Sequence, residues 1–130
     1  MKKTPQERDL SKRERQVLDA LYRLGKASAA DIRGAVKDPP TYTAIRTHLT
    51  NLEEKGFVRF ESDGVRYIYE PVVPREQMAD TVMENVLETF FENRLELVVS
   101  TLLNRKDASV GKEQLDRLAA IIEEARREGR

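Results

Sequence analysis

The sequence predicts a mainly α-helical protein with one small β-hairpin, arranged as a compact head followed by a helical arm. Three observations predict this fold class. Apolar residues recur at helical spacing in six segments, and two short runs of aromatic and β-branched residues flank a single tight turn. The segment Pro71-Val72-Val73-Pro74 cannot continue a helix and separates the two parts. We therefore expect two domains, residues 1–72 and 73–130.

The first helix is expected to begin after Ser11, because Ser11 and Glu14 have the spacing of a capping box. Gly25 is placed to end it. The inward face of this helix combines four apolar residues, Val17, Leu18, Leu21 and Leu24.

A second, shorter helix is expected from Ser28, and Asp38-Pro39-Pro40 ends it. Its apolar residues are Ile32, Ala35 and Val36.

A third helix is expected over residues 43–55, and Gly56 ends it. Its inward residues, Ile45, Leu49 and Leu52, leave a polar outer face with one arginine and no acidic residue before Glu53. This outer face and its entrance consist of Thr41, Tyr42, Thr43, Arg46, Thr47, Thr50 and Asn51.

Two strands complete the predicted head, at residues 57–61 and 65–70, with Ser62-Asp63-Gly64 as the turn between them. Three short helices followed by a hairpin are typical of a winged helix-turn-helix. Threonine and arginine side chains can hydrogen-bond base edges or phosphates, so the third helix is a candidate DNA-reading element. Arg59 and Arg66 of the hairpin, and Lys12, Arg13 and Arg15 near the first helix, are candidate contacts to the DNA backbone.

The distribution of charge along the chain agrees with a DNA-binding head better than the net charge of the whole chain, which is zero. The chain has 23 basic and 23 acidic residues, but residues 1–70 hold 14 and 11, and residues 71–130 hold 9 and 12. The net charges are therefore +3 and −3, and the basic excess belongs to the predicted head. A charge of +3 is a weak signal by itself and gains meaning only from the architecture.

Several functions lack the residues they require. There is no cysteine and only one histidine, His48, so we expect no metal site, no cofactor and no catalytic residues. His48 is interpreted as a packed or groove-facing side chain. The polar start of the chain has no signal peptide, and no apolar run is long enough to insert into a membrane, so we expect a cytoplasmic protein.

The arm is predicted to contain three amphipathic helices, over residues 75–91, over residues 94–105 and around residues 115–122. Three thin helices bury little surface by themselves. They can pack on the head of their own chain or against a second copy, and the length of their apolar stripes favours a homodimer. The residues expected at the dimer interface are Val82, Met83, Val86, Leu87, Phe90, Leu95, Val98, Val99, Leu102, Leu115, Leu118 and Ile122.

The stretch Thr41 to Gly56, followed by Phe57-Val58 and by Gly64-Val65-Arg66-Tyr67-Ile68-Tyr69-Glu70-Pro71, resembles the penicillinase repressor family. The resemblance extends over roughly residues 8–125 and includes Leu10 to Glu14. It implies a homodimeric repressor that binds a double-stranded DNA operator. By position in the family pattern, Thr43, Arg46 and Thr47 are the major-groove contacts, and Thr41, Thr50 and Arg66 lie nearer phosphate.

The family also implies a signal that relieves repression, such as a sensor or a protease acting on the arm. Members of the resistance branch are inactivated by proteolysis at an Asn-Phe pair in the arm, and the matching residues 97–102 contain no such pair. The copper branch senses metal through a C-terminal cysteine cluster, and this sequence has no cysteine.

The leading hypothesis is therefore a sequence-specific, homodimeric repressor acting on a pseudo-palindromic operator. It predicts that Arg46→Ala loses about 1–3 kcal/mol of discrimination between base sequences. A second hypothesis is a protein–protein adaptor whose winged helix binds no DNA. An enzyme is a third, and no spacing in the sequence pairs a nucleophile with a base.

Overall fold

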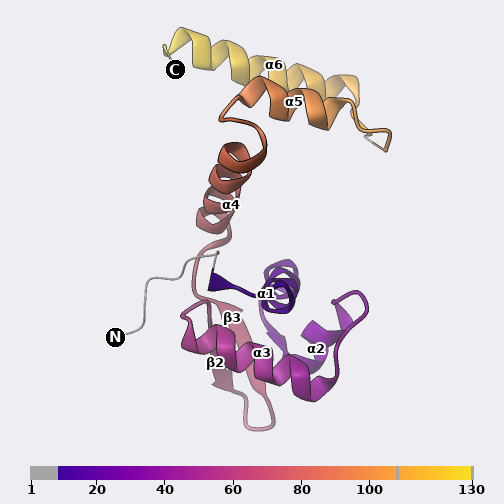
Figure 1. Ribbon diagram of the computed structural model, residues 1–130, viewed down its shortest axis with the longest axis vertical. Coiled ribbons are helices and arrows are strands. Elements are labelled where there is room, and N and C mark those ends of the chain that lie inside the picture. Colours follow the sequence, from indigo (N-terminus) through magenta and orange to yellow (C-terminus); the bar gives the residue numbers. More distant parts are fainter. Residues whose placement is uncertain (1–8, 108, 130) are drawn as a thin grey trace. The chain divides into compact units, whose positions relative to one another are not determined.

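The computed structural model describes residues 9–107 and 109–129, so the polar start of the chain lies outside the described residues. It forms two compact units, one extending to Glu84 and one from Asn85 onward. In chain order the elements are α1 (Lys12–Leu24), β1 (Ala27–Ser28), α2 (Ala29–Gly34), α3 (Tyr42–Glu54), β2 (Val58–Ser62), β3 (Tyr67–Pro71), α4 (Arg75–Phe90), α5 (Leu95–Leu103) and α6 (Lys112–Arg127) (Figure 1). The predicted domain division after residue 72 stays a prediction.

The head of the molecule has the winged helix-turn-helix plan that the sequence predicts, three helices followed by a hairpin. Its core combines apolar residues from α1, α2 and α3 with the hairpin, and Phe57 is its largest fully buried side chain. The capping box of α1 is formed, since the Ser11 hydroxyl accepts from the Glu14 amide and the Glu14 carboxylate accepts from the Ser11 amide. Leu24, which we expected to face inward, is 44% exposed, because it lies in the last turn beside Gly25.

The sheet has three antiparallel strands in the order β1-β3-β2 rather than the two of a simple hairpin. The unpredicted strand β1 has only two residues, which pair Ala27 with Tyr69 and Ser28 with Ile68. Between β2 and β3 the register pairs Val58 with Pro71 and Ser62 with Tyr67. The turn therefore extends to Arg66, and strand β3 begins two residues later than expected.

The loop between α2 and α3 sets the start of α3. The Arg33 guanidinium donates to the carbonyl of Pro40 at 2.8 Å. Thr41 is the N-cap of α3, and its hydroxyl oxygen accepts from the Ala44 amide at 3.1 Å. The first contact connects α2 to the loop, and the second connects the loop to α3. Together they fix where α3 begins relative to α2.

The chain leaves the head along a short, hydrogen-bonded connection. The Tyr22 hydroxyl donates to the carbonyl of Val73 at 2.7 Å, and the Arg75 guanidinium donates to the carbonyl of Tyr22. Met78, in the first turns of α4, packs against the core of the head. The beginning of α4 is thus part of the first compact unit.

In the second unit, α5 and α6 lie side by side and enclose an apolar groove (Figure 1). Val98 is the buried residue among those described in this unit, and large apolar side chains lie open along the helices. Phe90 is 73% exposed and Ile121 is 64% exposed. None of the helices in the described part of the chain has the length and apolar character needed to span a membrane.

Candidate nucleic-acid interface

The outer face of α3 carries the polar side chains that the sequence predicts. Thr43, Arg46, Thr47 and Thr50 are all exposed, and with Tyr42 they line a shallow hollow along the helix. The Thr47 hydroxyl donates to the carbonyl of Thr43 at 3.1 Å, and the Thr50 hydroxyl donates to the carbonyl of Arg46 at 3.0 Å. Because these protons point back to the helix, the oxygens present acceptor lone pairs outward, beside a methyl group. Such a face suits amino groups and thymine methyl groups in the major groove.

Arg46 differs from the threonines, because its side chain runs toward strand β3. The guanidinium carbon lies 6.0 Å from the centre of the Tyr67 ring, within cation–π range. The Arg46 charge also acts on the Tyr69 hydroxyl. Burial raises the pKa of Tyr69, and the nearby Arg46 charge partly offsets this rise.

Aromatic rings on the two long strands support that tyrosine pair. The Phe60 ring lies 4.5 Å from the Tyr67 ring and 5.6 Å from the Tyr69 ring, measured between centroids. Tyr69 is buried, whereas Tyr67 is exposed. The wing, which consists of β2, β3 and the turn between them (residues 58–71), therefore brings the Tyr67 ring and the Tyr69 side chain to Arg46.

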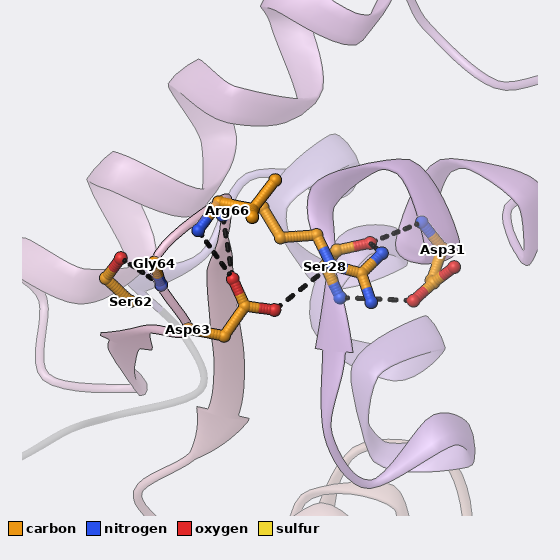
Figure 2. A network of polar contacts seen from close by, with 7 residues as sticks. Ser28, Asp31, Ser62, Asp63, Gly64 and Arg66 are labelled. Carbon is orange, nitrogen blue, oxygen red and sulfur yellow. Dashed lines mark hydrogen bonds and ion pairs between the residues drawn. The ribbon is translucent and has the colours of Figure 1, made fainter.

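The turn of the wing is held by Asp63 (Figure 2). One oxygen of its carboxylate accepts from the amides of Val65 and Arg66 at 3.0 and 2.9 Å, and the other lies 3.5 Å from the Arg66 guanidinium. The hydrogen bonds from the Arg66 and Val65 amides lower the pKa of Asp63. The Arg66 side chain extends from the turn to the Ser28 hydroxyl, at 3.5 Å (Figure 2).

Arg59 lies on β2, and its guanidinium is 2.7 Å from the Glu70 carboxylate on β3. That hydrogen bond holds the pKa of Glu70 below its ordinary value, and Lys26 approaches the same carboxylate at 3.5 Å. Arg59 is thus engaged within the sheet, and its contact to DNA stays a prediction.

Of the basic residues at the start of α1, Lys12 and Arg13 are exposed and Arg15 is half-buried. Arg13 donates to the side chain of Gln16 at 2.9 Å and to the carbonyl of Asp38 at 3.3 Å, which brings it beside the loop before α3. Lys12 is exposed in the preceding position. Neither is brought to the hollow along α3.

His48 is half-buried in α3, and its Nδ1 atom is buried without a hydrogen-bond partner among the described residues. This agrees with the interpretation of His48 as a packed side chain. The described residues contain no cluster of histidine, aspartate and glutamate suited to hold a metal ion.

Along the arm, the residues expected at a dimer interface differ in exposure. Val98 is buried, and Val82, Val86, Leu87, Val99 and Leu118 are half-buried. The other half of the set lies open to solvent: Met83, Phe90, Leu95, Leu102, Leu115 and Ile122.

The sequence does not single out Tyr67, Tyr69 and Ser28 as neighbours of the candidate interface residues Arg46 and Arg66. It indicates the two tyrosines only as strand-forming residues, and Ser28 only as a helix start. The sequence does contain a signal that these two side chains lie together, because residues 67 and 69 are two apart on a strand and therefore lie on the same face. That this face meets Arg46 depends on packing between α3 and the sheet, which no local pattern specifies.

The chain belongs to the penicillinase repressor family, whose model matches residues 10–124. It is a DNA-binding transcriptional repressor, in agreement with the winged helix-turn-helix head. The family is one of transcriptional regulators and not of enzymes. No curated protein sequence matches the chain.

Similar solved structures are more distant. The Bordetella bronchiseptica protein BpsR, whose DNA binding is described as regulated by 6-hydroxynicotinic acid, is 14% identical over 91% of this chain and 76% of its own, with a TM-score of 0.48. A mutant of Staphylococcus aureus MepR is 16% identical over 95% and 83%, with a TM-score of 0.49. TrmBL2, an archaeal chromatin protein, is 28% identical over 90% and 39%, with a TM-score of 0.46.

Proposed function

We propose that the protein represses transcription as a homodimer bound to a pseudo-palindromic operator, with one winged head on each half-site. The observation that carries this proposal is the pairing of a polar, acceptor-rich face on α3 with large uncovered apolar side chains on the arm. The first supplies a surface for reading DNA, and the second supplies a surface for a second copy.

In this proposal α3 enters the major groove and presents Thr43, Arg46 and Thr47 to it. The remaining contacts are to the DNA backbone or through the wing, from Lys12, Arg13, Thr41, Tyr42, Thr50, Arg59 and Arg66. A single head with a net charge of +3 over residues 1–70 would bind weakly and with a marked dependence on salt. Two linked heads raise the affinity without any new type of contact.

The arm, residues 73–130, is proposed as the dimerisation domain, and residues 1–72 as the DNA-binding domain. The groove between α5 and α6 is lined by apolar residues that include Leu102, Leu103, Leu115 and Ile121. A second arm laid along this groove would remove those side chains from water. The net charge of −3 over residues 71–130 keeps the arm off the DNA backbone. A sensor or a protease that acts on the arm would relieve repression.

Selection of the full-length protein on a library of random duplexes tests the proposal. The expected result is enrichment of one sequence with two-fold symmetry, together with a dimer in sedimentation. No enrichment would contradict it. Weak binding that is insensitive to both sequence and salt would instead support the adaptor hypothesis.

A further inference from the structure

A winged helix-turn-helix contacts DNA with two elements, here α3 and the wing, and part of the DNA must lie in the space between them. A sugar-phosphate strand separates each major groove from the neighbouring minor groove. If α3 lies in the major groove and the wing reaches the adjacent minor groove, that strand must pass between them. The relevant surface is therefore the gap between α3 and the wing.

The structure has a cavity in this gap, with a volume of about 340 Å³. It is open to solvent, so a strand can enter it. Its polar and aromatic lining comes from the wing, from α3 and from the start of α2, and consists of Ser28, Tyr42, Arg46, Arg66, Tyr67 and Tyr69.

Arg46 and Arg66 are the two cations that line the cavity, one from α3 and one from the turn of the wing. Both are exposed, and in the described part of the chain the one acidic residue that forms an ion pair with either is Asp63, 3.5 Å from Arg66. Two guanidinium groups that converge from separate elements are suited to a phosphate, because each offers several donors in one plane.

The direction of Arg46 supports the same ligand. An arginine that reads guanine points outward, away from the helix, to reach two acceptors on the base edge. Here the guanidinium is turned to the side, over the Tyr67 ring at 6.0 Å, and its charge lowers the pKa of Tyr69 against the effect of burial. Only part of its donor capacity is used there, since a guanidinium has five N–H groups.

We propose that this cavity holds one backbone phosphate of the bound operator, with Arg46 and Arg66 as its cations. Tyr67 and Tyr69 are positioning residues that hold Arg46 beside the strand. The inference rests on the proposed function and refines it: Thr43 and Thr47 read the bases, and the loss of discrimination that the sequence predicts for Arg46→Ala is replaced by a loss of affinity for every sequence. Arg46 contributes affinity to every DNA sequence.

Operator duplexes with a single uncharged methylphosphonate linkage, placed in turn along each strand, test the cavity. One linkage between the read major groove and the adjacent minor groove should weaken binding of the unmodified protein about tenfold. The same linkage should have little effect, less than about twofold, on Arg46→Ala and Arg66→Ala, which have already lost that contact. Arg23→Ala removes an exposed arginine outside the cavity and is the matched control, with the full response to the linkage.

Arg46→Ala should also lower the slope of log affinity against log salt by about 1 and leave the base preferences from random selection unchanged. Tyr69→Phe keeps the ring and removes the hydroxyl whose pKa responds to Arg46. It should reduce the response to the critical linkage while the midpoint of thermal unfolding stays near that of the unmodified protein. Tyr67→Leu should reduce the same response through loss of the ring face.

An altered base preference in Arg46→Ala would overturn the inference, because Arg46 would then read a base. It would also be overturned if every linkage had the same effect on the unmodified protein and on both arginine variants. Either result leaves the repressor proposal standing if a symmetric operator is selected. Failure to select any operator would overturn both.

Discussion

Glu14 connects the first helix of the head to the end of the reading helix. Its carboxylate caps α1 through the Ser11 amide and accepts from Lys55 Nζ at 2.6 Å, and Lys55 is the C-cap of α3. Burial alone would raise the pKa of Glu14, but the hydrogen bonds from Lys55 and Ser11 outweigh it and leave the pKa below its ordinary value of 4.5. The charged form of Glu14 is therefore favoured by folding.

The first prediction concerns the charge of Glu14. Because the pKa is lower in the folded state, the contribution to stability is fully present above the unfolded pKa and is lost as the pH falls below 4.5. Glu14→Gln keeps a capping box and should lose about 1–2 kcal/mol at pH 7, because Lys55 loses its charged partner. Urea unfolding at pH 7 and at pH 3 should show this difference shrinking at the lower pH. A difference that is the same at both values would contradict the account.

At the scale of the element, the start of α3 depends on Thr41. Its hydroxyl oxygen accepts from the Ala44 amide, which satisfies one of the unpaired donors at the helix start. Thr41→Ala should lower the free energy of unfolding by about 1 kcal/mol, and Thr41→Ser, which keeps the cap, should lower it by much less. Chemical denaturation of the two variants measures this. Equal losses in both would mean that the methyl group, not the cap, matters.

The wing provides a second prediction at this scale. Asp63→Asn keeps the side-chain oxygen that accepts from the Val65 and Arg66 amides but removes the negative charge beside Arg66. Affinity for DNA should rise by about two- to fivefold at low salt, with a smaller gain at high salt, because exposed charge pairs are weak and screened. Fluorescence anisotropy at two salt concentrations checks this. Lower affinity at both would show that Asp63 itself contacts DNA or that the turn has changed.

Most helices of this chain could be predicted from the sequence, because their signals are local. Ser11 and Glu14 lie at the helix start that they set, whereas α2 ends at Gly34, before the Asp38-Pro39-Pro40 segment expected to end it, and leaves Ala35 and Val36 outside the helix. Strand β1 could not be predicted, since two small residues have no strand pattern and pair with β3 only once the head has folded. The start of β3 was placed too early for a related reason, because Asp63 holds the following residues in the turn.

The candidate interface also combines residues that local patterns predict with residues that only the folded head brings together. The exposed face of α3 follows from helical periodicity, so Thr43, Thr47 and Thr50 could be placed from the sequence. The surroundings of Arg46 could not, because Tyr67 and Tyr69 reach it from a strand about twenty residues later in the chain. Direct contact of these residues with DNA stays a prediction.

At the scale of the whole molecule, the arm should control oligomeric state. Ile121 is 64% exposed and belongs to the lining of the groove between α5 and α6. Ile121→Asp places a charge where a second arm would bury it, so it should shift the protein to monomers and weaken operator binding. Glu124→Ala, a change on the same helix outside that lining, should remain a dimer. Sedimentation velocity of the full-length variants distinguishes them, and an unchanged dimer in Ile121→Asp would place the interface elsewhere.

The central claim is that two heads of one dimer read the two halves of one operator. The most direct measurement compares affinity for the selected operator with affinity for duplexes in which the left or the right half-site is scrambled. Scrambling either half-site should lower the affinity equally, by on the order of 100-fold, because only one head of the dimer then binds its sequence. A loss confined to one half, or no loss in either, would contradict it.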